Sequence, residues 1–218
     1  VRALVFAGKY VEAEQLATEK VMSQTNHGMP YQTFGDLRIS FPGHARYTDY
    51  YRDLNLDSAR ATVRYKVDGV AFKREVFTSF TDQVVIIKLS ASKKKKITFN
   101  AQLTSPQQDA FIAVEGNVIT LSGITPTHER QRGKIKFNGR LTAKVTGGTS
   151  IYKDGVLSVE NANEAVLYVS IATNFVNYKD ISADEKLRAK TYLDKALIVD
   201  YNTAKRTHTD YFQQFMKR

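Results

Sequence analysis

The spacing of hydrophobic and polar positions changes twice along the chain. Over the first 22 residues, apolar side chains recur at intervals near three and four, which predicts helix with a break at Gly8. From about residue 35 the interval is two, in short segments rich in Val, Ile, Thr, Phe and Tyr. The helical interval returns after Thr173. The predicted strands are 35–41, 47–56, 58–67, 70–78, 83–90, 97–104, 117–123, 134–146, 149–152, 156–160 and 164–173.

Two turn motifs and one strand indicate how the predicted strands are arranged. Asp68-Gly69 and Asp154-Gly155 tolerate the positive φ angles of tight turns, so antiparallel hairpins are expected there. The segment from Val84 to Leu89 is apolar on both faces apart from Lys88. Such a strand is typically covered on both sides, which indicates two stacked sheets. The sequence therefore predicts a mainly β fold, a large antiparallel β-sandwich with helices at both ends of the chain.

The C-terminal residues predict two helices. Ser182-Ala183-Asp184-Glu185 fits a capping box, and we expect the helix that it begins to run to about Leu197. The second helical run carries one apolar and aromatic stripe, formed by Tyr201, Ala204, His208, Tyr211, Phe212 and Phe215. Part of this stripe is expected to pack on the sandwich. Because the stripe continues to the end of the sequence, its last residues predict an exposed apolar patch that contacts a domain following Arg218.

The patterns divide the chain into a helical segment at 1–24, a sandwich body at 30–175 and C-terminal helices at 180–218. Residues 23–30 are small and polar, which predicts a loop. The sequence starts at Val1 without a signal-peptide pattern and ends within a helical pattern. We therefore expect it to be part of a longer protein.

Composition excludes several classes of protein. With 218 residues, of which 42% are hydrophobic, the chain can bury a sizeable core and is not disordered. No run approaches the ~18 apolar residues of a membrane helix, so no membrane span is expected. The absence of cysteine excludes a disulfide scaffold, a thiolate metal site and a cysteine nucleophile.

The net charge of +10 raises the question of a polyanionic partner. The run from Lys93 to Lys96 lies between two predicted strands, where a solvated hairpin is expected. The residues Lys134, Lys136, Arg140 and Lys144 form one face of a predicted strand, which we interpret as the water-facing side of a sheet. No nucleic-acid partner is therefore predicted, and polyanion binding through these residues is kept as an alternative.

Motifs that carry chemistry are absent from the sequence. The four histidines have neither the spacing of metal ligands nor a nearby carboxylate at such spacing, so no metal and no cofactor is expected. We interpret the acidic residues at strand ends and turns as turn caps or ion pairs rather than as a catalytic pair; they are Asp36, Asp49, Asp53, Asp57, Glu75 and Asp82. Tryptophan is absent, but Tyr47, Tyr50 and Tyr51 form a cluster that could stack on a sugar ring.

Several passages resemble one known family. The helical passage Val1–Ala17 contains the letters GKYVEAEQLA, and Tyr31–Ile39 reads YQTFGDLRI. The most specific passage runs from Tyr51 to Val84 and includes YRDLNLDSA, VRYKVDGV and REVF. The passage His208–Arg218 reads HTDYFQQFMKR. Together these passages resemble the N-terminal domain of glycoside hydrolase family 95, which is related to glycosyl hydrolase family 65 N-terminal domains. The resemblance is strong over residues 1–106 and persists from residue 111 to 173 only as a strand pattern.

The resemblance implies a fold, a role and a location. Members of that family are chiefly inverting α-L-fucosidases, with some α-L-galactosidases, and they join an N-terminal β-supersandwich through linker helices to an (α/α)6 catalytic barrel. Their catalytic residues lie in the barrel and have no counterpart here, so no catalytic residue is assigned. The chain is then expected to be a non-catalytic supersandwich with linker helices that buttresses a downstream barrel acting on a carbohydrate. The family's opening strands have no match, so open sheet edges are expected. A periplasmic or secreted location is implied in the same way.

The resemblance also places candidate contact residues. Those expected at the interface with the barrel are Tyr201, His208, Tyr211, Phe212 and Phe215. The basic and polar loop from Thr125 to Arg132 is the candidate to approach the substrate cleft, through His128, Arg130 and Arg132. A surface loop without such a role is the alternative.

Two other classes of function remain open from the residues alone. A stand-alone carbohydrate-binding module would use Tyr47, Tyr50 and Tyr51, and it predicts sugar affinity in this chain by itself. A polyanion-binding β-protein would use the two basic regions, and it predicts binding that weakens steeply with salt. Neither class explains the aromatic helix at the end of the sequence.

Overall fold

The computed structural model describes residues 1–22, 31–129 and 131–216. It contains two compact units, Val1–Gln32 with Thr127–Arg132, and Thr33–Pro126 with Gly133–Arg218. The first unit holds helices α1 (Arg2–Phe6) and α2 (Tyr10–Lys20), separated at Gly8, whose φ of 74° favours glycine. Both helices and the break were predicted from the residue spacing. The loop predicted at 23–30, which includes His27, lies outside the described residues.

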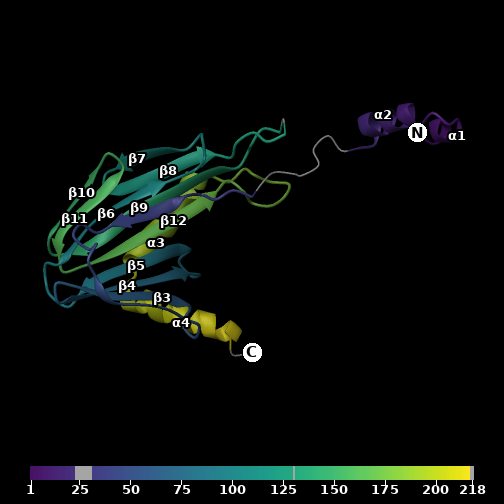
Figure 1. The fold of residues 1–218 in the computed structure, drawn as a ribbon. Coiled ribbons are helices and arrows are strands. Elements are labelled where there is room, and N and C mark those ends of the chain that lie inside the picture. Colours follow the sequence, from purple (N-terminus) through teal and green to yellow (C-terminus); the bar gives the residue numbers. More distant parts are fainter. Residues whose placement is uncertain (23–30, 130, 217–218) are drawn as a thin grey trace. The chain divides into compact units, whose positions relative to one another are not determined.

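The second unit contains a two-sheet β-sandwich, whose strands are drawn in blue, teal and green in Figure 1. The larger sheet has eight strands in the order β2-β3-β4-β5-β12-β9-β8-β7, and the smaller has four in the order β1-β6-β11-β10, with every pairing antiparallel. The strands are β1 (Asp36–Ser40), β2 (Thr48–Asn55), β3 (Arg60–Val67), β4 (Val70–Ser79), β5 (Val84–Ala91), β6 (Ile97–Thr104), β7 (Phe111–Glu115), β8 (Val118–Ile124), β9 (Lys136–Thr146), β10 (Thr149–Lys153), β11 (Val156–Ala162) and β12 (Glu164–Thr173). This architecture confirms the predicted β-sandwich with helices at both ends.

The two predicted hairpins are confirmed by their backbone angles. Asp68 and Gly69 have φ of 49° and 70°, and Asp154 and Gly155 have φ of 51° and 76°. Two successive positive φ angles match the right-handed twist of the paired strands. These turns fix the register of β3 with β4 and of β10 with β11.

The core between the sheets and the layer outside the larger sheet are both apolar. On one face of β5, Ile87 and Leu89 join the core that both sheets share. On its other face, Val84 and Ile86 belong to a second cluster that includes Leu193 of the C-terminal helices. The prediction of two sheets is therefore correct, but helices rather than a sheet cover the second face of β5.

The C-terminal helices α3 (Glu185–Ile198) and α4 (Tyr201–Met216) lie against the larger sheet (Figure 1). Helix α3 begins two residues later than a capping box headed by Ser182 would require. Its N-cap is Asp184, whose Oδ1 accepts hydrogen bonds from the backbone amides of Lys186 and Leu187, each at 2.9 Å. The acidic side chain of Asp184 satisfies two amides by itself, so the predicted cap at Ser182 is corrected.

The predicted basic face is turned to water at Lys134, Lys136 and Lys144 but not at Arg140. Arg140 is only 8% exposed and binds the carboxylate of Glu115 with an Nη2–Oε2 distance of 2.6 Å. Lys144 donates a hydrogen bond to the carbonyl oxygen of Leu197 at the end of α3. Helix α3 packs over β9 and β12, so this face lies partly beneath a helix. The other basic region, Lys93 to Lys96, is exposed in its turn as predicted.

Candidate functional site

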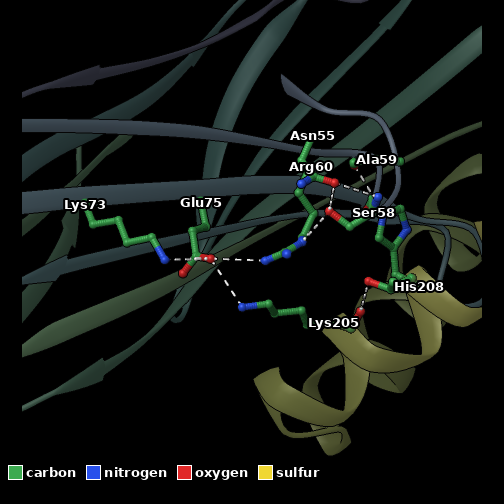
Figure 2. Close-up of polar contacts among 9 residues, drawn as sticks. Asn55, Ser58, Ala59, Arg60, Lys73, Glu75, Lys205 and His208 are labelled. Atoms are coloured by element: carbon green, nitrogen blue, oxygen red, sulfur yellow. Dashed lines mark hydrogen bonds and ion pairs between the residues drawn. The ribbon is translucent and has the colours of Figure 1, made fainter. Parts of the chain in front are cut away.

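The junction between α4 and the larger sheet is organised around Glu75 of β4. Its side chain is 8% exposed, and its Oε1 atom lies 3.3 Å from Arg60 Nη1, 3.0 Å from Lys73 Nζ and 3.2 Å from Lys205 Nζ. Figure 2 shows the three cationic groups converging on one carboxylate, two from the sheet and one from α4. A buried carboxylate with several cationic partners is a strong local anchor, and here it ties the helix to the sheet.

Burial and charge act in opposite directions on Glu75. Burial favours its neutral form, but the hydrogen bond from Lys73 and the positive charges of Lys205 and Lys73 outweigh burial and hold the pKa of Glu75 below its ordinary value of 4.5. Glu75 is therefore ionised at neutral pH. The carboxylate serves as a structural counter-ion at this junction.

The lowered pKa of Glu75 predicts how stability changes with pH. A carboxyl group whose pKa is lower in the folded state stabilises the fold above its unfolded pKa, and that stabilisation is lost as pH falls through the folded-state pKa. The free energy of unfolding should therefore drop below about pH 4.5. In Glu75→Gln this part of the drop should disappear. Urea unfolding of both proteins between pH 7 and pH 3 measures the difference; parallel curves would contradict the assignment.

His208 forms a second anchor, about one helical turn beyond Lys205. Its Nε2 lies 3.1 Å from the carbonyl oxygen of Ser58 and 3.2 Å from that of Ala59, in the turn between β2 and β3. Because both partners are acceptors, Nε2 carries the proton. The ring is 1% exposed and stacks on Phe77 with centroids 4.9 Å apart. His208 therefore fixes the helix to a turn and to a strand at once.

The turn that His208 contacts is itself held by side chains. Asn55 Oδ1 accepts hydrogen bonds from the backbone amide of Ser58 at 2.9 Å and from its hydroxyl at 2.8 Å. Arg60 Nε donates to Ser58 Oγ at 3.0 Å, which links this turn to the Glu75 cluster (Figure 2). The turn and the cluster therefore form one continuous polar network beneath α4.

The structure divides the predicted aromatic stripe of α4 into two parts. Tyr201 is half-buried with its ring 6.0 Å from that of Phe77, and burial raises its pKa. Together with His208, it is used in packing within this chain. The prediction of a contact with another domain therefore concerns the distal residues Tyr211, Phe212 and Phe215.

The distal part of the stripe forms a partly exposed aromatic patch. The ring of Tyr211 lies 5.5 Å from that of Phe80 and 5.3 Å from that of Phe215. Phe80 is 55% exposed and Phe215 is 50% exposed, while Phe212 is half-buried. We call Phe80, Tyr211, Phe212 and Phe215 the terminal patch. Its exposure agrees with the prediction of an apolar surface at the end of the chain.

The candidate cleft loop is only partly described. The backbone amides and carbonyls of His128 and Gln131 exchange two hydrogen bonds, of 2.9 and 2.8 Å. The side chain of His128 is half-buried and that of Arg132 is exposed, while Arg130 lies outside the described residues. Their contact with a substrate cleft stays a prediction.

Three of the acidic residues that we interpreted as turn caps or ion pairs have partners of that kind. Besides Glu75, Asp49 forms an ion pair of 2.8 Å with Lys66, and Asp82 accepts a hydrogen bond of 2.6 Å from Ser79 Oγ. Within the described ranges there is no group of three or more residues that could hold a metal ion, and no helix has the length and apolar character to cross a membrane.

The three tyrosines of the predicted sugar-stacking cluster lie on or next to edge strand β2 but do not share one surface. Tyr47 and Tyr50 line a pocket, and their ring centroids are 5.5 Å apart. Tyr51 lies opposite Arg64 in the β2–β3 register and is not among the pocket residues. The other pocket residues were not predicted: Arg52 lies on β2, and the rest come from β3, β4 and the loop before β2.

Comparison with known proteins identifies the family. The family model described as glycosyl hydrolase family 65, N-terminal domain, matches residues 1–178. Alpha-L-fucosidase 2 of Arabidopsis thaliana is 33% identical over 211 residues, which cover 86% of this chain and 24% of that protein. Probable alpha-fucosidase A of Aspergillus niger is 29% identical over 190 residues, which cover 82% of this chain and 23% of that protein. The chain thus spans about a quarter of the length of these relatives.

A solved structure supports the fold alone. A chain titled "Putative kojibiose phosphorylase from human microbiome" aligns with a TM-score of 0.54 and 13% identity, over 82% of this chain and 27% of that chain.

The names of the curated relatives confirm the resemblance to fucosidase-like enzymes that the sequence motifs predicted. The match to the family model covers both N-terminal helices and the whole sandwich. The chain therefore belongs to the family of glycosyl hydrolase family 65 N-terminal domains.

Proposed function

We propose that this chain is the non-catalytic N-terminal domain of an inverting α-L-fucosidase-like glycoside hydrolase and that it buttresses a catalytic barrel following α4. One observation carries the proposal. Helix α4 is anchored to the sheet by Lys205 and His208, and its last turns carry the exposed Phe215 beside the half-buried Tyr211 and Phe212. A rigidly held helix that presents an apolar end is suited to support a neighbouring domain.

The comparisons support the carbohydrate part of this proposal. Both curated relatives are named as fucosidases, and each is about four times as long as the aligned region. The substrate of the whole protein is therefore proposed to be a fucosylated oligosaccharide or polysaccharide. The same resemblance supports a periplasmic or secreted location. The loop with His128, Arg130 and Arg132 remains the candidate to wall one side of the substrate cleft.

The terminal patch provides the test of the buttress. In the protein extended past Arg218 through the next domain, Phe215→Asp is expected to lower both the thermal midpoint and the rate of fucoside hydrolysis, because a charge would be placed in an apolar interface. In the present chain alone, the same change should alter the free energy of unfolding by less than about 1 kcal/mol.

A matched substitution separates an interface effect from a general one. Tyr178 is 84% exposed in the loop after β12, so Tyr178→Asp adds the same charge at another exposed aromatic position. It is expected to leave both proteins unchanged. If Phe215→Asp also leaves the longer protein unchanged, then the terminal patch does not support the barrel.

A further inference from the structure

A cationic aromatic pocket lies at the β2 end of the larger sheet. Its volume is about 320 Å³, and it is lined by His44, Tyr47, Tyr50, Arg52, Val63, Tyr65 and Arg74. Arg52, Val63 and Arg74 are register partners on neighbouring strands, so all three side chains project from the same face of β2, β3 and β4. The face covered by α4 is the opposite one, because Glu75 and Phe77 of β4 point to it.

The charge of this pocket is positive and uncompensated. The residues that line it include two arginines and no aspartate or glutamate. Burial, followed by the nearby charge of Arg74, lowers the pKa of His44, so the imidazole is neutral at pH 7 and the arginines carry the charge. Across the part of the chain that the structure describes, neither Arg52 nor Arg74 has an acidic partner within ion-pair distance.

Arg74 is held in place before any ligand binds. Its guanidinium carbon lies 3.9 Å from the ring centroid of Phe41 and 4.9 Å from that of Tyr65. One terminal nitrogen donates a 2.7 Å hydrogen bond to the hydroxyl of Tyr65, which in turn lies 2.8 Å from His44 Nδ1. Since the hydroxyl accepts from Arg74, it donates to the neutral imidazole. The Arg74 Nε atom is buried and has no acceptor among the described residues.

The pocket also offers flat apolar surfaces. Tyr47 and Tyr50 are each 53% exposed. Tyr47 also packs edge-on against buried Tyr65 at 6.2 Å, which supports its position. An exposed pair of tyrosine rings beside two guanidinium groups suits a ligand that has both a ring with apolar C–H faces and a negative charge.

We propose that this pocket binds an acidic saccharide, with its carboxylate on Arg52 and Arg74 and its pyranose ring against Tyr47 and Tyr50. Guanidinium groups bind carboxylates through paired hydrogen bonds, which a neutral sugar cannot form. The choice of a saccharide rather than another carboxylate rests on the proposed function, whereas the selection of an anion rests on the pocket alone. The site lies apart from α4 and the terminal patch, so it is a second role for the same domain.

Calorimetric titration of the present chain with trigalacturonic acid tests this proposal. Two control ligands are titrated in the same way. The fully methyl-esterified form of the trisaccharide keeps the sugar rings but has no charge, and inorganic phosphate is an anion without a sugar ring. We expect the acid to bind with a dissociation constant of about 0.1–1 mM and the ester and phosphate to bind at least about ten-fold more weakly. Equal binding of acid and ester, binding of phosphate as tight as that of the acid, or no binding of the acid up to about 10 mM would overturn the proposal.

Two substitutions localise the binding. Arg52 is exposed and has no side-chain partner among the described residues, so Arg52→Gln is expected to fold normally and to weaken binding of the acid about ten-fold or more. Lys94→Gln removes the same charge from the exposed turn between β5 and β6 and should leave binding unchanged. Circular dichroism checks that both variants are folded. Equal losses in the two variants would mean that binding follows net charge, and the pocket would be rejected. None of these measurements depends on fucoside hydrolysis. The proposed binding pocket and the proposed buttress role can therefore be disproved independently of each other.

Discussion

Replacement of Phe77 by alanine is expected to lower the free energy of unfolding by about 3–5 kcal/mol. The Phe77 side chain is 2% exposed and lies between β4 and α4, where it contacts the rings of His208 and Tyr201. Its removal would leave a cavity beneath the helix and would take away the surface on which His208 stacks. Urea unfolding followed by circular dichroism measures the loss.

Phe80 provides the control for this prediction. It lies three residues further along the chain and is 55% exposed, and its ring contacts that of Tyr211. Phe80→Ala should therefore cost less than about 1 kcal/mol. Hydrogen exchange adds a local readout, because the amides of α4 should lose protection in Phe77→Ala and keep it in Phe80→Ala. Similar losses in the two variants would show that Phe77 does not hold the helix.

Glu75→Ala is expected to destabilise the fold by about 2–4 kcal/mol at pH 7. The substitution leaves Arg60, Lys73 and Lys205 close together without the carboxylate that they share. The expected loss is below that of a fully buried pair, because the side chains of these partners are 23–36% exposed. Thermal and urea unfolding at neutral pH measure the effect.

The exposed Glu160 of β11 gives a substitution with the same change in net charge. Glu160→Ala should stay within about 0.5 kcal/mol of the parent protein. A double-mutant cycle with Lys205→Met then isolates the link between α4 and the sheet, and a coupling above about 0.5 kcal/mol is expected. A loss in Glu75→Ala no larger than that in Glu160→Ala would contradict the role assigned to this cluster.

Local sequence patterns predicted most of the fold. Alternation located the long strands, and the two Asp-Gly turns fixed two hairpins, because these signals depend only on neighbouring residues. Strand β7 was missed. Its residues Phe111–Glu115 form a short apolar run without alternation at the edge of the larger sheet, and such a run does not distinguish strand from helix.

The way in which helices cover the outer face of the larger sheet could not be predicted from strand patterns. Alternation showed that Arg140 and Lys144 share a face, but a polar face beneath a helix has the same pattern as one in water. Arg140 is buried because Glu115 of β7 supplies its counter-charge, and β7 had not been predicted. To predict this burial, one would need to know which helix covers which strand. That arrangement depends on tertiary contacts and not on the local sequence.

The candidate site depends on contacts between distant residues. The hydrogen bond from Lys205 to Glu75 spans 130 positions, and that from His208 to Ser58 spans 150. The sequence indicated the stripe of α4 and its continuation beyond the sandwich, but not which stripe residues pack inward. One contact of the Glu75 cluster could have been found from the local sequence. In β4, Lys73 and Glu75 are two positions apart and therefore on the same face of the strand.

The most direct test of the central claim is hydrolysis of an α-1,2-linked fucosyl oligosaccharide by two proteins. One is the present chain, and the other continues past Arg218 through the following domain. We expect release of fucose only by the longer protein, because the catalytic barrel is proposed to follow α4. Release of fucose by the present chain would contradict the account, since a catalytic carboxylate pair would then lie within the sandwich.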